Sequence, residues 1–200
     1  MKRGYLKSVG YAVGIMFFVM VTTVLTGCAI GNRYIALRYE PILMQKATSS
    51  QKVAIVKFSD MRKTPEVGEV RNAYGIKLAS VLVKDQDVGA CVANALADEL
   101  TKAGYEIQKF QDAAPLDINI VITGSVPEAY TRMYMKSTTI VKANITVTRA
   151  NVVVLNKEYT GKASVLALTG STGEYENVMK KALQNLMKEM TPDVISAIEK

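Results

Sequence analysis

Residues 141–148 alternate strictly between apolar and polar side chains. Val141, Ala143, Ile145 and Val147 are apolar, and a polar residue follows each of them. Successive side chains of a β-strand point to opposite faces of the sheet, so the pattern predicts a strand with one buried and one solvated face. Such a sheet needs a second layer over its buried face, and antiparallel pairing is its usual arrangement.

The C-terminal region predicts part of that second layer. Ser171 and Glu174 have the spacing of a capping box, which favours the start of a helix. Pro192 follows Thr191, which predicts that a separate short helix starts there and completes the core. Between these points apolar side chains recur at the spacing of one helix face, at Tyr175, Val178, Met179, Ala182, Leu183, Leu186, Met187 and Met190.

Residues 87–103 predict a second amphipathic helix. Its apolar stripe consists of Val88, Cys91, Val92, Ala95, Leu96 and Leu100. Asp85 or Asp87 can cap the start, and Gly104 stands where a helix ends in a left-handed residue. We interpret Cys91 as a buried thiol, because no His and no neighbouring cation in the sequence would lower its pKa.

Further strands are predicted at 52–58, 76–83, 105–110, 116–122 and 152–168. Residues 149–151 can form a hairpin turn, so the later strands form a meander. The fold class that follows is α+β, a two-layer sandwich in which two amphipathic helices cover one face of a mostly antiparallel sheet.

The N-terminus has the organisation of a bacterial export signal. Lys2, Arg3 and Lys7 precede an apolar run at 9–25, and no acidic residue interrupts this region. An ordinary cleaved signal and an uncleaved membrane helix are the alternatives, although 17 residues barely span a hydrocarbon core of ~30 Å.

The end of this run, Leu25-Thr26-Gly27-Cys28, resembles the bacterial lipobox. The resemblance implies that a signal peptidase cuts before Cys28, with Leu25 in an apolar pocket and with Thr26 and Gly27 small enough to pass. It also implies a diacylglycerol on the Cys28 thiol and a fatty acid such as palmitate on the new amine. Several lipid chains anchor a protein stably, whereas a single chain does so marginally.

The residue after the lipobox, Ala29, bears on the membrane to which the protein is sorted. The resemblance brings a sorting rule with it, in which Asp at this position retains a lipoprotein in the inner membrane. Ala29 therefore implies that the protein is anchored in the outer membrane and faces the periplasm. We expect three segments: a signal peptide at 1–27, the lipidated Cys28 with a flexible tether at 28–51, and a single periplasmic α+β domain at 52–200.

Charge and composition exclude several classes of function. The net charge of +7 falls to about +4 without the three cations of the signal, which does not favour nucleic acid as a partner. The chain has no His, which removes His-based catalysis and His metal ligands, and its two cysteines cannot form a four-thiolate metal site. We predict no enzymatic activity, no cofactor and no metal site.

The segment 130–136 contains the strongest candidate for a contact surface. As a strand it would place Met133 and Met135 on one face and project Tyr130, Arg132, Tyr134 and Lys136 together from the other. A solvated outer face is the simpler interpretation. Tyr and Arg are enriched where proteins meet their partners, so the same face is a candidate site for an envelope protein, a lipid phosphate or a glycan.

The order of these features resembles the YajG-type bacterial lipoproteins. In that family a hydrophobic strand closes in an Asp-x-Arg turn, matched by Asp60 and Arg62, and the first helix closes in Gly-Tyr or Gly-Phe, matched by Gly104 and Tyr105. The similarity covers about residues 22–190. It implies a fold and an envelope location, and it carries no assigned activity.

Three functional hypotheses follow. The first is a non-enzymatic, lipid-anchored accessory or structural component at the periplasmic face of the outer membrane. The second is a lipid, lipopolysaccharide or glycan binding module of an envelope assembly or transport system. The third, a hydrolase that uses carboxylates alone, would require acidic side chains to converge in a way that the sequence does not show.

Overall fold

The computed structural model describes residues 31–200 except 44, 49, 73, 85–86, 116, 134–135 and 167–169. The chain divides into two units, and the second, Asn32–Lys200, contains the strands and helices described here. Leu25, Thr26, Gly27 and Cys28 lie outside the described residues, as do Tyr134 and Met135 of the candidate contact segment.

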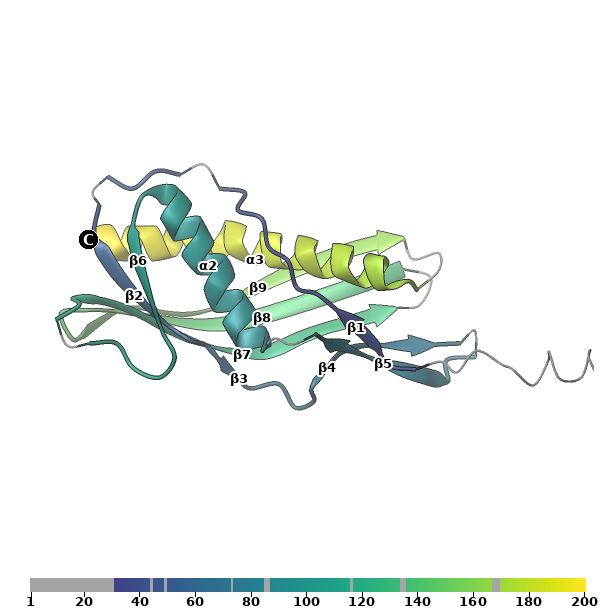
Figure 1. Cartoon of the computed structure of the whole chain (residues 1–200). Helices are drawn as coiled ribbons and strands as arrows, with labels where there is room; N and C mark the ends of the chain where they lie inside the picture. Colours follow the sequence, from purple (N-terminus) through teal and green to yellow (C-terminus); the bar gives the residue numbers. More distant parts are fainter. Residues whose placement is uncertain are drawn as a thin grey trace, which may run out of the picture. The chain divides into compact units, whose positions relative to one another are not determined.

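The described residues form a nine-stranded sheet with two helices on one of its faces (Figure 1). This arrangement confirms the predicted α+β sandwich. The elements in chain order are β1 Arg33–Ile35, β2 Lys52–Val56, β3 Ser59–Asp60, β4 Glu66–Arg71, β5 Lys77–Val83, α2 Val88–Ala103, β6 Glu106–Phe110, β7 Ile120–Met133, β8 Lys136–Arg149, β9 Val152–Leu166 and α3 Thr172–Glu199.

The long strand β7 lies at the centre of the sheet. On one side it pairs antiparallel with β8, which pairs antiparallel with β9, so the predicted meander is confirmed for these three strands. The predicted strand at 105–110 lies outside the meander, because β6 pairs in parallel with β2. On its other side β7 pairs in parallel with three short strands, β2, β3 and β4. Parallel neighbours need long connections between them, and the connection between the parallel strands β2 and β6 contains β3, β4, β5 and α2.

Both predicted helix starts are confirmed. The Asp87 side chain caps α2 by accepting from the backbone N–H groups of Gly89 and Ala90, and Gly104 ends this helix with a left-handed φ of 111°. Ser171 and Glu174 form the predicted capping box at the start of α3.

The predicted break at Pro192 is wrong, because α3 continues through this residue to Glu199. Proline lacks the N–H that would bond four residues back, which usually disfavours a helix interior. The apolar stripe continues on both sides, with Met190 and Val194 both buried. Burial of this stripe against the sheet therefore outweighs one lost backbone hydrogen bond.

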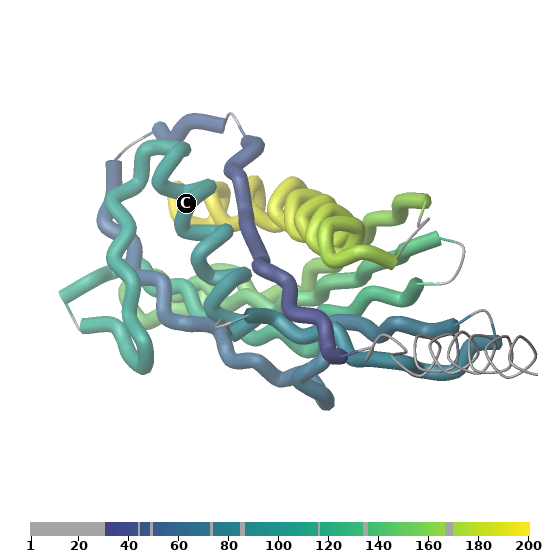
Figure 2. The backbone as a smooth tube through the Cα atoms, turned by 45° about the vertical axis from the view of Figure 1, so that its right-hand side comes forward, coloured from purple at the N-terminus to yellow at the C-terminus, as the bar shows by residue number. Residues whose placement is uncertain are grey.

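The predicted tether is corrected for residues 36–48, which we call the strap. Figure 2 shows this segment running over the helical layer. Its backbone N–H groups donate to side chains of both helices, for example from Ala36 to Glu176 of α3 at 2.9 Å and from Ile42 to Glu99 of α2 at 2.8 Å. The strap has no periodic pattern because side chains of other elements hold it, so the folded unit begins at Asn32 and not at residue 52.

Candidate functional site

The described candidate contact residues, Tyr130, Arg132 and Lys136, lie on the sheet face opposite the helices. Within β7, Ala129 and Thr131 are buried beneath the helical layer, whereas Tyr130 is half-buried and Arg132 is exposed. Met133 packs against the core, as the alternation predicts. Lys136 is exposed at the start of β8. The structure therefore brings Tyr130 and Arg132 to one face.

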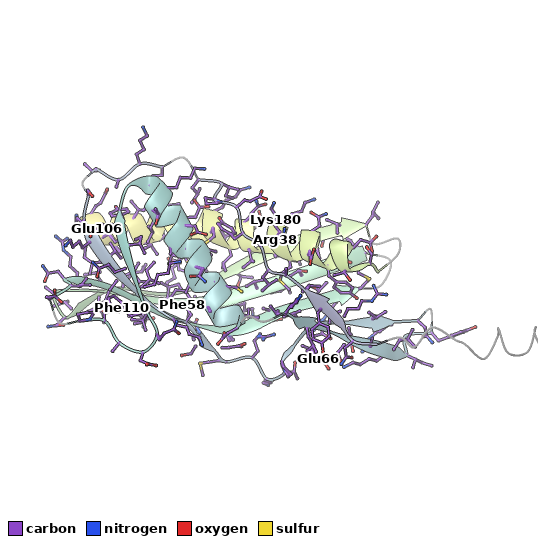
Figure 3. All side chains as sticks on the ribbon, in the orientation of Figure 1. Arg38, Phe58, Glu66, Glu106, Phe110 and Lys180 are labelled. Carbon is purple, nitrogen blue, oxygen red and sulfur yellow. The ribbon has the colours of Figure 1, made fainter. Side chains whose placement is uncertain are left out.

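Two cavities meet at Tyr130 on this face. The first, of about 280 Å³, lies between residues 127–130 and the segment that contains Arg62 and Glu66. The second, of about 490 Å³, is lined by Tyr130, Arg132 and Met133 of β7 and by Glu69 and Arg71 of β4. We call the two cavities together with Tyr130 and Arg132 the outer face. Figure 3 places Glu66 on this side of the sheet and Lys180 of α3 on the other.

Cations hold the carboxylates of the outer face in place. Glu66 accepts from Lys77 at 2.7 Å, Glu69 accepts from the Arg71 Nε at 2.8 Å, and Glu128 lies 3.3 Å from the Lys142 Nζ. The Lys77 ammonium and the Ser80 hydroxyl lower the pKa of the Glu66 carboxyl. These carboxylates are thus neutralised locally.

Some cations of the same region lack such a counterion among the residues that the structure describes. Arg132 and Lys136 form no ion pair with any residue that the structure describes. Beside Arg132, burial raises the pKa of the Tyr130 phenol to about 12, and the Glu69 carboxylate adds to this shift. At neutral pH the outer face therefore presents a neutral phenol beside a guanidinium that pairs with no carboxylate in the described part of the chain.

Asp60 and Arg62 form a turn, as the sequence predicts. The Arg62 guanidinium donates to both Asp60 oxygens, from Nε at 2.9 Å and from Nη2 at 2.7 Å. Its Nη1 also donates to the backbone oxygen of Glu66 at 3.1 Å. Arg62 thereby fixes the loop that forms one wall of the first cavity.

Other reactive groups are confined or dispersed. Cys91 is buried within α2, and burial raises its pKa to about 11. Among the described residues no three His, Cys, Asp or Glu side chains are grouped in a way that could hold a metal ion. None of the helices in the described part of the chain is long and apolar enough to cross a membrane.

The sequence pattern does not predict the β4 wall of the outer face, Glu69 and Arg71. A bulge between Glu66 and Gly68 shifts the register of β4, and the shift breaks the two-residue alternation that would have marked this strand. The only available signal was the close spacing of an acidic and a basic residue at 69 and 71.

Comparisons with solved structures show a shared fold at low sequence identity. Protein XCC0632 from Xanthomonas campestris superposes with a TM-score of 0.57 and 12% identity, over 83% of this chain and 96% of that chain. A second crystal structure, of an uncharacterised protein, gives 0.52 and 7% identity, over 82% and 99% of the two chains. A search of curated proteins finds no match.

Sequence comparison with protein families gives a match across most of the chain. Residues 41–195 fit the model of a family described as "Uncharacterized lipoprotein". The matched region runs from the strap through α2 and the whole meander into the last turns of α3. The chain therefore belongs to this family of lipoproteins.

Proposed function

We propose that this protein is a non-enzymatic accessory component of the cell envelope, anchored by lipid on Cys28 to the periplasmic side of the outer membrane, and that it binds an envelope protein through the outer face. The observation that carries the proposal is the position of Tyr130, which separates two cavities on the helix-free side of the sheet. The YajG-type assignment within the lipoprotein family is part of the same proposal.

The composition of the outer face supports protein binding. Tyr and Arg dominate the energetics of many protein interfaces, because they supply large contact areas together with hydrogen-bond donors. Tyr130 and Arg132 have these properties and lie beside concave surface. Most neighbouring charges are already paired, so a partner would have to desolvate few isolated ions.

The anchor is tested at Cys28. Cys28→Ser should abolish incorporation of radiolabelled palmitate and leave unprocessed precursor, because the serine oxygen does not replace the thioether sulfur. Ala29→Asp should retain labelling and move the protein to the inner membrane. Palmitate labelling that persists in Cys28→Ser would refute the anchor.

The contact face is tested by cross-linking in intact envelopes followed by mass spectrometry. The double variant Tyr130→Ala, Arg132→Ala should lose specific cross-links to a partner protein. In a matched control, Glu158 and Lys162, which are exposed on β9, are both replaced with alanine. This control variant should keep the specific cross-links. Unchanged cross-links in the Tyr130 and Arg132 variant, with an unchanged melting temperature, would argue against the proposal.

Arg132 and Lys136, which pair with no carboxylate among the described residues, favour a second candidate function, a module that binds lipid, lipopolysaccharide or glycan. Arg132 and Lys136 could receive a phosphate group at the larger cavity. Native mass spectrometry after mild detergent extraction distinguishes the two candidate functions. A bound lipid or sugar that is lost in Arg132→Ala supports the lipid or glycan binding module. A co-purifying protein supports the accessory component.

A further inference from the structure

The turn between β4 and β5 displays large apolar side chains to solvent. Tyr74 is 90% exposed and Ile76 is 61% exposed, and Leu78 follows them on β5 with 39% exposed. We call these three residues the apolar tip. Exposed apolar side chains that gather at one end of a molecule mark a contact with another apolar phase or partner.

The shape of this turn does not depend on the displayed side chains. The Asn72 Oδ1 accepts from the backbone N–H groups of Tyr74 at 3.0 Å and Ile76 at 2.9 Å. Arg71 donates from Nη1 to the Gly75 oxygen at 2.6 Å, and Gly75 has a left-handed φ of 78° that suits glycine. A turn built from Asn72, Arg71 and Gly75 thus leaves the side chains of Tyr74 and Ile76 available for contact.

The start of β1 points toward this tip. β1 pairs in parallel with β5, with Arg33 opposite Val81. One residue earlier, the Asn32 Oδ1 accepts from the Ser80 backbone N–H at 3.2 Å. Going backward from β1 therefore follows β5 backward, toward the β4–β5 turn, which projects beyond both helices in Figure 1.

Chain length places Cys28 within reach of the tip. Five peptide units join Cys28 to Arg33, and they span at most about 17 Å. Along β5, Val81 and Ile76 are also five residues apart, which is about 17 Å at the rise of a strand. The five peptide units are therefore long enough for a lipid on Cys28 to reach the level of the apolar tip.

We propose that the apolar tip inserts into the interfacial region of the lipid bilayer beside the acylated Cys28. This inference rests on the lipid anchor of the proposed function. Tyr74 has the amphipathic ring that favours the interface, and Ile76 and Leu78 supply apolar area. The contact would fix the orientation of the domain, while the lipid provides most of the affinity.

The absence of Trp from the sequence permits a direct test. The full chain carrying Tyr74→Trp is expressed in its host, purified with its lipid and reconstituted into vesicles of phosphatidylethanolamine and phosphatidylglycerol. We expect its emission maximum to shift to shorter wavelength, and its intensity to fall when the lipids are brominated. Ile76→Ser in the same background should weaken both effects.

The matched control is Val152→Trp. Val152 is 63% exposed and lies opposite Arg149, which pairs with Ile120 at the far end of β7 from the tip. Its emission should be the same with and without brominated lipids. Leu78→Trp serves as a second reporter at the tip if Tyr74→Trp yields too little protein.

The outcomes separate the inference from the anchor on which it rests. Mass spectrometry of the same sample reports the lipid on Cys28. Lipidated protein without quenching at position 74 or 78 would overturn membrane contact and leave the anchor intact. Equal quenching at positions 74 and 152 would overturn the proposed orientation. Protein without lipid on Cys28 would overturn both the anchor and the inference.

Discussion

Glu99 is a buried carboxylate in α2 whose hydrogen-bond donors, among the described residues, all come from the strap. The Tyr39 hydroxyl and the Ile42 N–H donate to its Oε1, and the Leu43 N–H donates to Oε2 at 3.1 Å. A buried charge is tolerated when its oxygens are bonded in this way. The three donors come from one short segment, so Glu99 is one of the side chains that attach the strap to the domain, together with Glu176 and Glu199.

We predict that Glu99→Gln weakens this attachment. An amide presents one oxygen where the carboxylate presents two, and its NH₂ group would face a donor. Hydrogen bonds to charged groups contribute about 1.5 to 3 kcal/mol each, so we expect a loss of this order in the free energy of unfolding. Urea denaturation measures it, and limited proteolysis should show faster cleavage within the strap. The control is Asp98→Asn, at the exposed neighbouring position. Equal free energies of unfolding for the two variants would contradict this role of Glu99.

At the scale of elements, the contact between α3 and β9 depends on Gly161. A Cβ atom at this position would lie 2.1 Å from the Ala182 backbone oxygen and 2.6 Å from the Leu186 backbone nitrogen. We expect Gly161→Ala to push the helix from the sheet and to lower the free energy of unfolding by at least the ~1 to 3 kcal/mol typical of overpacking. At Gly173 in the first turn of α3 no atom lies within 4 Å of an added Cβ, so Gly173→Ala should be neutral or slightly stabilising. Thermal unfolding of both variants measures the difference.

The β8–β9 hairpin offers a stabilising change. Ala150 and Asn151 both have positive φ, at 46° and 64°, which is the requirement of a type I′ turn. The left-handed region costs an ordinary residue about 1 to 2 kcal/mol, whereas Asn adopts it more readily. Ala150→Asn should therefore raise the free energy of unfolding by about 0.5 to 1 kcal/mol, and Ala150→Val should lower it. The same sign for both substitutions in calorimetry would refute the role of turn conformation.

The sequence predicted those elements whose own pattern determines them. The stripe of α3, the caps at Asp87 and Ser171 and the alternation in β8 are local signals, and the structure confirms each of them. The strap and β4 escaped prediction for physical reasons. Side chains of α2 and α3 hold the strap, and a bulge interrupts the period of β4. The predicted strand at 116–122 begins only at Ile120, where pairing with β8 starts.

The candidate site was predictable to a similar extent. Alternation along one strand was sufficient to place Tyr130 and Arg132 on the same face. Their concave surroundings depend on β4, which reaches Thr131 of β7 only through a parallel pairing between residues distant in sequence. No local pattern encodes such a pairing, so the cavities and the paired carboxylates become visible only in the folded molecule.

At the scale of the whole molecule, buried tyrosines join the layers. The Tyr159 hydroxyl of β9 donates to Asp193 of α3 at 2.9 Å, and the Tyr175 hydroxyl of α3 donates to the Glu69 backbone oxygen of β4 at 2.8 Å. The Tyr105 hydroxyl donates to Glu199 near the end of α3 at 3.2 Å. Burial is the main cause that raises the pKa of each phenol, to about 12 for Tyr105 and Tyr175.

These raised pKa values predict loss of stability in alkaline solution. Tyrosine in the unfolded chain titrates near pH 10. Above that pH the unfolded state releases protons that the folded state retains, so the free energy of unfolding falls as pH rises, by about 1.4 kcal/mol per pH unit for each such tyrosine until its folded pKa is reached. The contribution is complete below pH ~10 and is lost between about pH 10 and 12 for Tyr105 and Tyr175. Urea unfolding between pH 8 and 12 measures this slope. The double variant Tyr105→Phe, Tyr175→Phe should be less stable at pH 8, because two hydrogen bonds are lost. Its free energy of unfolding should also fall less steeply above pH 10. An unchanged slope would show that the titration of these two phenols does not cause the alkaline loss of stability.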